Sequence, residues 1–575
     1  MGSRGAVALS LGLVIVAGPW QPARSDEGIV VTEASTLHAT DYGLVADGVT
    51  DDGAAIAAML AAASQATGPI VLRFPEDATI RVLTAHERYV FRLDGVESWT
   101  IDGGGSTFLL DPHIRFARVQ RCRSVAIRDL DIDFDPLPFA DGTITAVDEA
   151  ARHLEVRLDD PTAPAPSGGP TGEDGEQAFF AMVWHESEHG TTSTHCWTEL
   201  MEPAGEPGRV LLHAAESFNG YPDIELGRTR ISLPVPGIAH RYGPGPCLEL
   251  QDNNGLKLSD VEIWSAPWFA CNVSRNMGDV TFTRVHIRPK PGSKRLMSTW
   301  RDGFHVKGNR GRLLWEDCIL EGMNDDAFNI STHSSTVDEV SGSTVRVHQR
   351  FPLLPIPWEP GGTFRAVDHA SGRLLGEATV VAAEAGPKPP PIQGKPAAPA
   401  YTLTLDEPID DLEPGAMAWD PTWCNPDTTL RRCTIRMSCR LQSPVTVEAC
   451  DVTALLWFYA EPIEGGYPHQ VSVRDCVFRP GRGNPVHAVI FSGGTYPDAE
   501  MPDPGAPPRA LRDVWVEGSS FYGGLRIEGV QDLHLIGNRF LDPDASVVLR
   551  GCVDAVVEDN TGPDGVPVEL GVTRE

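Results

Sequence analysis

Most of the chain repeats a short pattern in which apolar and polar residues alternate. Each copy leads through a polar pair to one fixed position, as in Gly255-Leu-Lys-Leu-Ser-Asp-Val261 and Asp279-Val-Thr-Phe-Thr-Arg-Val285. Alternation with a period of two is typical of a strand that buries one face. Successive fixed positions lie one short coil apart, and a repeat of this kind is typical of a solenoid. The pattern therefore predicts an all-β fold, a parallel β-helix.

The fixed position changes in character along the chain. It is Leu or Val in the early copies and Cys or Asn in later ones, at Cys318, Cys433, Cys450, Cys476, Asn538 and Asn560. Stacked coils place equivalent positions about 4.8 Å apart, so we expect an interior ladder of small side chains that ends as an amide ladder. A metal site built from the cysteines is the alternative, but no Cys-x-x-Cys pair accompanies them. We expect no metal and no cofactor.

An alanine-rich segment before the first coils has helical rather than alternating periodicity. It follows the motif 41–52 and precedes a short strand at 70–75, and its apolar residues recur at helical spacing at Ile56, Met59, Leu60 and Ala63. This order resembles the entry to pectin-lyase-like β-helices, which implies a right-handed solenoid whose open end is capped by the helix. A cap is needed because an open coil exposes a sheet edge.

Two stretches interrupt the repeat. Residues 136–240 and 336–420 contain short alternating strands around Gly- and Pro-rich loops, which predicts two antiparallel, barrel-like β modules inserted into the solenoid. The coils then occupy 26–135, 241–335 and 421–575.

The first 25 residues have a basic start, an apolar run from Ala6 to Ala17 and the small-residue pair Ala23 and Ser25. This pattern is typical of a signal peptide, and the run is shorter than the roughly 20 residues of a membrane-spanning helix. We expect residues 1–25 to be a signal peptide and the mature protein to be secreted, without membrane insertion.

The net charge of −32 restricts the classes of molecule that the protein can bind. So acidic a surface repels polyanions at long range, which excludes nucleic acid and disfavours pectate. Neutral sugars remain as partners. The 11 cysteines are an odd number and do not form the dense, paired set of a disulfide scaffold.

Three aspartates stand out as candidate catalytic groups. Hydrolysis of a glycosidic bond needs one carboxylic acid and one carboxylate. Asp302 and Asp325 are 23 positions apart, close to one coil, so the solenoid would set them on neighbouring rungs. Asp326 can share their face only if the backbone bulges or turns there, because adjacent strand residues point to opposite sides. Crowding would raise the pKa of at least one carboxyl group. On spacing alone, a role as turn residues is equally well supported.

The motifs around these aspartates are similar to those of polygalacturonases, but the chain lacks that family's Gly-His-Gly and Arg-Ile-Lys motifs. The segments Asp302-Gly-Phe-His-Val-Lys-Gly-Asn309 and Gly322-Met-Asn-Asp-Asp-Ala-Phe-Asn329 resemble more closely glycoside hydrolase family 110, the α-1,3-galactosidases. The resemblance implies an inverting exo-hydrolase for galactose-terminated glycans of the blood-group-B type or linear type. It implies Asp325 as the general acid and Asp302 and Asp326 as the groups that orient and deprotonate water.

Galactose has an apolar face and hydroxyl groups that need paired donors and acceptors, so aromatic and polar residues near the motifs are candidate ligands. The candidates are Trp268, Trp300, His305, Asn309, Asn329 and Glu461. For each alone, a place in the core or in a turn is at least as well supported.

Three other functions stay open on sequence grounds: a polygalacturonase-like hydrolase, a polysaccharide lyase, and a non-catalytic glycan-binding β-helix. A lyase needs calcium or a basic residue and usually a uronate, which suits an acidic chain poorly. The sequence leaves open the oligomeric state, a homo-oligomer included, and the need for a fucose branch.

Overall fold

The structure is a computed structural model. It describes residues 34–163, 180–187, 190–235, 238, 245–349, 355–368, 371–388, 398–459, 464–479, 487–492, 509–543, 546–568, 570 and 572–573. The predicted signal peptide and the candidate ligand Glu461 lie outside these residues.

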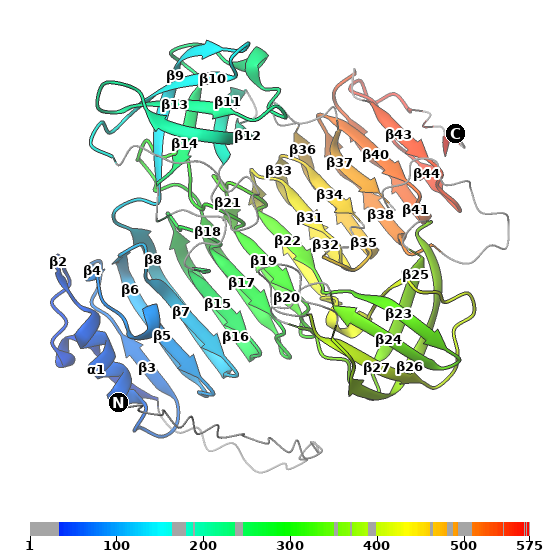
Figure 1. Ribbon diagram of the computed structural model, residues 1–575, viewed down its shortest axis with the longest axis horizontal. Coiled ribbons are helices and arrows are strands. Elements are labelled where there is room, and N and C mark those ends of the chain that lie inside the picture. The colour runs from blue at the N-terminus through cyan, green and yellow to red at the C-terminus, as the bar shows by residue number, and fades with distance from the viewer. Residues whose placement is uncertain are drawn as a thin grey trace, which may run out of the picture.

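Two long parallel sheets form the body of the molecule, a solenoid that runs from the blue N-terminal end to the red C-terminal end in Figure 1. In β16 (Asn254–Ile263) and β18 (Val280–Ile287), Val261 lies directly opposite Val285, as the repeat predicts. The predicted parallel β-helix is confirmed.

The 12-stranded sheet carries the candidate site. Its strands are β5 (Tyr89–Asp94), β7 (Arg115–Gln120), β15 (Leu248–Gln251), β17 (Cys271–Ser274), β19 (Phe304–Lys307), β22 (Phe328–Ser331), β31 (Cys439–Leu441), β34 (Leu456–Tyr459), β37 (His487–Ser492), β40 (Gly524–Glu528), β43 (Val547–Arg550) and β45 (Val572–Thr573).

The second sheet has 21 strands. Besides β16 and β18 they are β1 (Ser35–His38), β2 (Asp47–Asp51), β3 (Ile70–Arg73), β4 (Thr79–Val82), β6 (Trp99–Leu110), β8 (Arg123–Phe134), β20 (Leu313–Glu316), β21 (Ile319–Leu320), β29 (Thr428–Arg431), β30 (Thr434–Ile435), β32 (Val445–Glu448), β33 (Asp451–Thr453), β35 (His469–Arg474), β36 (Val477–Arg479), β38 (Arg512–Glu517), β39 (Ser520–Phe521), β41 (Gln531–Ile536), β42 (Arg539–Phe540) and β44 (Val556–Glu558).

The interior ladder predicted from the repeat is present. The backbone N–H of Cys433 donates to the Cys450 sulfur, and that of Cys450 donates to the Cys476 sulfur, each over 3.4 Å. Asn538 and Asn560 continue the ladder through an amide hydrogen bond of 3.0 Å. All 11 cysteines are buried free thiols, and among the described residues none belongs to a group that is close enough to share a metal ion.

A second amide ladder lies in turns that precede strands of the 21-stranded sheet. Its members are Asn253, Asn276, Asn309 and Asn425. The Asn309 side chain is fully buried, its oxygen accepts from Asn276, and its nitrogen donates to Asn425 and to the Val273 carbonyl. Both ends of this amide are paired within the ladder, so the structure gives Asn309 a structural role, and its role as a substrate ligand stays a prediction.

One α-helix is found in the described part of the chain, α1 (Gly53–Ala63), and it covers the N-terminal end of the solenoid. Ile56, Met59 and Ala63 form its buried face, in agreement with the predicted periodicity. The capping helix is confirmed.

Two closed antiparallel barrels of six strands are inserted between the coils. The first barrel consists of β9 (Phe139–Asp148), β10 (His153–Leu158), β11 (Phe180–Ser187), β12 (Gly190–Pro203), β13 (Arg209–Ala214) and β14 (Arg230–Pro234). The second barrel consists of β23 (Ser335–Ser341), β24 (Thr344–Gln349), β25 (Thr363–Asp368), β26 (Arg373–Ala385), β27 (Ala400–Leu405) and β28 (Met417–Trp419). Figure 1 shows them on opposite sides of the solenoid, and they confirm the two predicted modules.

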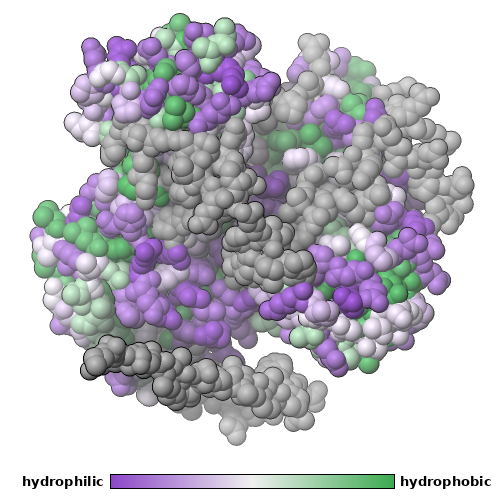
Figure 2. Space-filling view, in the orientation of Figure 1, coloured by the Kyte–Doolittle hydropathy of each residue, from purple (hydrophilic) through white to green (hydrophobic). Residues whose placement is uncertain are grey.

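Hydrophilic residues cover most of the described surface on the face shown in Figure 2, both barrels included. Within the described ranges, no helix has the length and apolar character needed to cross a bilayer.

Candidate active site

The 12-stranded sheet has a polar outer face where its strands β19 and β22 meet. Phe304 and Val306 of β19 are buried in the core. The alternate residues of β19 point to the other face, where His305 lies opposite Asn329 and Lys307 lies opposite Ser331. The period of the strand therefore turns the motif residues at 305 and 307 away from the core.

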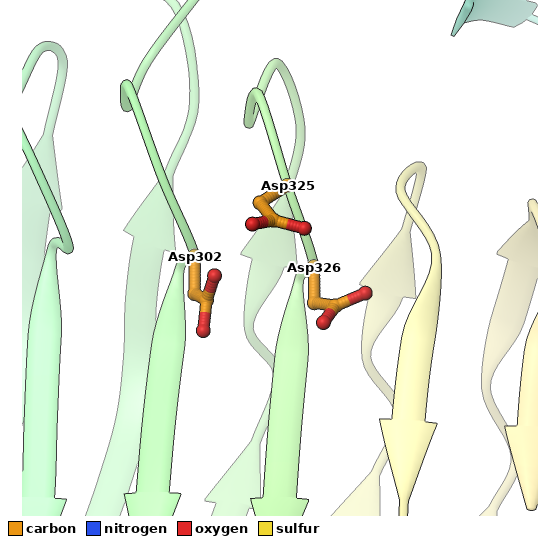
Figure 3. A group of neighbouring side chains, drawn as sticks. All are labelled: Asp302, Asp325 and Asp326. Carbon is orange, nitrogen blue, oxygen red and sulfur yellow. The ribbon is translucent and has the colours of Figure 1, made fainter. Parts of the chain in front are cut away.

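Asp302, Asp325 and Asp326 come together at the start of these two strands, as Figure 3 shows. One carboxylate oxygen of each lies within 4.8 Å of the others. The N–H of Gly303 donates to the carbonyl of Asp326 over 2.9 Å. This register places Asp302 level with Asp326, whereas the sequence spacing suggested Asp325. Asp325 joins the pair from the bend that precedes β22.

Each aspartate has its own partner. Arg301 lies 2.8 Å from the Asp325 carboxylate, and Arg440 of β31 lies 2.6 Å from that of Asp326. Asp302 contacts no arginine at these distances in the described residues; its Oδ2 lies 2.7 Å from Nδ1 of His305. The two arginines thus pair with Asp325 and Asp326, and the partner of Asp302 is an imidazole.

Burial and crowding separate the protonation states of these carboxyl groups. Burial, followed by the charge of Asp325, raises the pKa of Asp302 to about 8. Burial also raises the pKa of Asp326 well above its ordinary value, against the opposing charge of Arg440. The pKa of His305 is lowered by burial and then by the charge of Lys307, so its imidazole is neutral.

Asp325 differs from the other two. Burial acts to raise its pKa, but the positive charges of Arg301, His195 and Arg440 outweigh burial and leave the pKa below the ordinary value. Its side chain is also the most exposed of the three, at 20%, against 1% for Asp302 and 8% for Asp326. A carboxyl group with a lowered pKa is a poor proton donor at neutral pH. The charges of the free site therefore oppose the role of general acid that the resemblance implies for Asp325.

A buried network of charged residues contacts the residues around the aspartates. The sequence analysis did not predict it. The Lys307 ammonium donates to Asn329 Oδ1 over 2.7 Å and to Glu464 over 3.0 Å, and it also donates to Ser331. Glu464 lies 3.8 Å from Arg440 as well. Burial opposes ionisation of Glu464, but Lys307 and Arg440 overcome it and lower the pKa. Glu464 thus links Lys307 to the arginine that holds Asp326.

The structure places the predicted substrate ligands in different environments. The Trp300 side chain is fully buried and stacks on Phe180 of the first barrel with ring centroids 5.8 Å apart. The structure thus places Trp300 in the packing between the solenoid and the first barrel, and its contact with a sugar stays a prediction. Asn329 is also buried, and its oxygen accepts from Lys307. Its amide positions the network.

Two predicted ligands keep exposed surface beside the aspartates. The His305 side chain is 21% exposed next to Asp302. Its ring stacks on Phe269 at 4.4 Å, and Phe269 stacks on the half-buried Trp268 at 4.1 Å. This column carries an aromatic surface up to the carboxylates.

Several residues of the site escaped the sequence analysis. Arg301 and Lys307 lie inside the recognised motifs, and the alternation of β19 marks Lys307 as outward-facing. Arg440 and Glu464 lie beyond the second barrel, and no spacing in the sequence relates them to Asp326.

The three aspartates form the one group within the described ranges whose oxygen atoms are close enough to share a cation. Arg301 and Arg440 each pair with one of them. The arrangement suits acid–base chemistry by carboxyl groups.

Sequence comparison relates the chain to enzymes of one activity. It is 24% identical over 363 residues to α-1,3-galactosidase B of Bacteroides thetaiotaomicron, which covers 59% of this chain and 54% of the relative. It is 20% identical over 392 residues to α-1,3-galactosidase B of Akkermansia muciniphila, covering 63% and 47%. The chain is a distant homologue of α-1,3-galactosidases. It spans about half the length of these relatives.

A shorter match is closer in sequence. The chain is 33% identical over 81 residues to α-1,3-galactosidase A of Akkermansia muciniphila, 14% of each chain. No family model matches the chain.

Solved structures resemble the chain only weakly. The A-module of a mannuronan C-5 epimerase from Azotobacter vinelandii has a TM-score of 0.34 at 11% identity, covering 92% of this chain and all of that module. An α-1,3-glucanase from Streptomyces thermodiastaticus has a TM-score of 0.34 at 10% identity, covering 94% and 69%.

Proposed function

We propose that the protein is an exo-acting α-1,3-galactosidase that removes terminal α-1,3-linked galactose from blood-group-B-type and linear glycans. The observation that carries the proposal is the cluster of three aspartates whose pKa values are driven in opposite directions. A glycosidase needs one carboxyl group that holds a proton and one that has lost it. The choice of α-1,3-linked galactose as substrate is supported by the distant homology to α-1,3-galactosidases.

Two assignments of the acid and the base are open to test. The resemblance assigns the acid to Asp325. The charges of the free site favour the opposite, with Asp302 as the acid, because its pKa is about 8, and Asp325 as the base that deprotonates water. In either case the acid protonates the glycosidic oxygen and the bond from that oxygen to C1 of galactose breaks, so the remaining glycan leaves as an alcohol. The water that the base deprotonates bonds to C1, and galactose is released.

A substrate with a good leaving group distinguishes the two assignments. Fluoride departs from α-galactosyl fluoride with little help from an acid, so the variant that lacks the acid retains activity on this substrate. The variant that lacks the base loses activity on both substrates. Comparison of Asp302→Asn with Asp325→Asn on the fluoride and on an α-1,3-galactoside identifies the acid.

The stereochemical outcome needs its own measurement. Inverting glycosidases usually hold their two carboxyl groups roughly 6.5 to 9.5 Å apart, but the nearest oxygens here lie within 4.8 Å. Inversion therefore rests on the resemblance. Proton NMR of the first-formed sugar tests it, since a β-galactose product means inversion and an α product rejects it.

The substrate is tested with a panel of linear and fucose-branched α-1,3-galactosides, with released galactose as the readout. Asp302→Asn, Asp325→Asn and Asp326→Asn are compared with Asp260→Asn, an exposed aspartate paired with Arg284 on the other sheet. We expect the site variants to lose galactose release and the control to keep it. Wild-type protein that binds these glycans without turnover would instead indicate a glycan-binding β-helix.

The lyase alternative makes a different product. Elimination from a uronate creates an unsaturated sugar that absorbs near 235 nm, whereas hydrolysis of a galactoside does not. Rising absorbance with pectate or alginate and no released galactose would reject the galactosidase proposal.

A further inference from the structure

The first barrel packs directly on the coils that hold the aspartates. Phe180 of β11 stacks on Trp300, the residue two positions before Asp302, with an interplanar angle of 26°. The Ser193 hydroxyl of β12 contacts the Met437 sulfur at 3.9 Å, just before β31. The barrel wall formed by β11 and β12 therefore reaches coils on both sides of β22.

One side chain of this wall reaches the turn that precedes Asp325. His195 of β12 places its Nε2 2.7 Å from the backbone carbonyl oxygen of Asn324. A carbonyl oxygen only accepts hydrogen bonds, so Nε2 must carry a hydrogen in both the neutral and the charged imidazole. This carbonyl belongs to the peptide unit that joins Asn324 to Asp325. A bond from the barrel thus anchors the backbone immediately before Asp325.

Packing fixes the orientation of the His195 ring. Phe180 meets it edge-on, with centroids 5.0 Å apart, and Trp197 lies 6.3 Å away. Phe180 contacts Trp197 at 4.7 Å as well. The same aromatic cluster therefore docks the barrel on Trp300 and holds the imidazole in place.

The ring also contributes charge. When protonated, His195 acts on Asp325 in the same sense as Arg301 and Arg440 and lowers the pKa of that carboxyl group. Other charges around Asp325 act in the opposite sense. The groups that face this carboxylate are Arg301, Arg440, His195, Glu464, Asp302 and Asp326. His195 is the member of this group that the first barrel supplies.

We propose that His195 is a positioning residue for Asp325, and that the first barrel is in this way a working part of the active site. Its Nε2–H group holds the Asn324–Asp325 peptide, and its imidazole, when charged, favours the ionised Asp325 carboxylate. The proposal rests on the proposed function, in which Asp325 takes part in galactoside hydrolysis.

Two substitutions separate the hydrogen bond from the charge. In His195→Gln, the amide Nε2 lies as many bonds from Cα as Nε2 of histidine does. It can still donate a hydrogen bond, but it cannot be charged. In His195→Phe, the ring shape that packs on Phe180 and Trp197 remains, and both donor and charge are lost. His213→Gln is the matched control, a barrel histidine of β13 that pairs with Glu202.

We expect His195→Phe to lower kcat roughly tenfold to a hundredfold, the range for a small misplacement of a catalytic group, with little change in KM or melting temperature. His195→Gln keeps most of kcat. Both variants lose the charge that lowers the pKa of Asp325, so in both the limb of the rate profile that Asp325 governs moves to higher pH. This is the acidic limb if Asp325 is the base and the alkaline limb if it is the acid. His213→Gln changes neither property.

A second measurement does not depend on activity. Hydrogen–deuterium exchange of a peptide spanning 322–329 reports the anchoring of the turn, and exchange is expected to rise in His195→Phe and to stay near wild type in His195→Gln. Unchanged exchange together with wild-type kcat in His195→Phe would overturn the proposal. If the wild-type protein releases no galactose but exchange still rises in His195→Phe, the proposed function is rejected, while the anchoring of the turn by His195 is supported.

Discussion

The two barrels share one architecture but make different contacts with the solenoid. The first barrel uses His195 to hold the turn before Asp325, close to the chemistry. The second barrel packs on the C-terminal coils, where Trp419 stacks on the buried Tyr467 at 5.7 Å and Arg365 donates to His469 over 3.0 Å. The hydrogen bond of the second barrel ends on a side chain, whereas that of the first barrel holds a backbone peptide next to Asp325. We therefore expect the first barrel to position the candidate active site and the second barrel to stabilise the solenoid.

The largest effect on the rate of galactose release is expected at the aspartates themselves. Substitutions in both barrels are compared with it. Asp325→Asn should lower the rate of galactose release roughly 10²- to 10⁴-fold, the usual contribution of a general acid or base. The melting temperature should change little, because the substitution keeps the shape of the side chain. Initial rates and thermal unfolding measure the two effects. A variant with wild-type rates would place the catalytic centre elsewhere.

Removal of the aromatic contact of the second barrel should cost stability and leave catalysis intact. Trp419→Ala deletes a large buried side chain, and such deletions lower the free energy of unfolding by roughly 3 to 5 kcal/mol. Denaturant unfolding measures the loss, and kcat of the folded protein is measured under native conditions. Val381→Ala, at a site that is 55% exposed on the same barrel, is the control. A fall in kcat in Trp419→Ala would break the contrast between the barrels.

The equivalent deletion in the first barrel should affect both properties. Phe180→Ala removes a buried ring from the contact with Trp300 and from the support of His195. We expect a loss of stability of about 3 kcal/mol together with a fall in kcat of roughly tenfold. If kcat is unchanged while stability falls, the first barrel is a structural module like the second.

The last pair of effects concerns pH and tests the aspartates rather than the barrels. Because the pKa of Asp302 is raised to about 8, the folded protein favours the protonated form. Its contribution to stability is complete below the ordinary pKa of an aspartate and is lost as the pH rises through about 8. Unfolding measured from pH 4 to pH 9 should show this decline, and Asp302→Asn should flatten it. An equal decline in the variant would assign the pH dependence to other groups.

The same titration predicts an effect on catalysis. If Asp302 is the acid, the rate on α-1,3-galactosides falls as the pH rises through about 8, because the proton is lost. With α-galactosyl fluoride this alkaline limb should weaken. A limb of equal size on both substrates would argue for a different acid.

The sequence alone determined the β-helix, the capping helix and the two inserted modules, because each depends on a local period of hydrophobic residues. It also indicated that Asp302 lies close to Asp325 and Asp326, since one coil separates their motifs and the stacking of coils converts that spacing into proximity. It did not show that two predicted ligands, Trp300 and Asn309, are fully buried. The asparagines at 253, 276 and 425 could have revealed the ladder that contains Asn309.

Only the tertiary structure decided the electrostatic surroundings of the aspartates. Arg440 reaches Asp326 from 114 residues away in sequence, and His195 reaches the turn at Asn324 from 129 residues away. The second barrel separates Arg440 from the motif and His195 belongs to the first barrel, so the coil repeat does not encode these contacts. The pKa values depend on burial and on the positions of several charges at once, and these are set when the coils and barrels pack together.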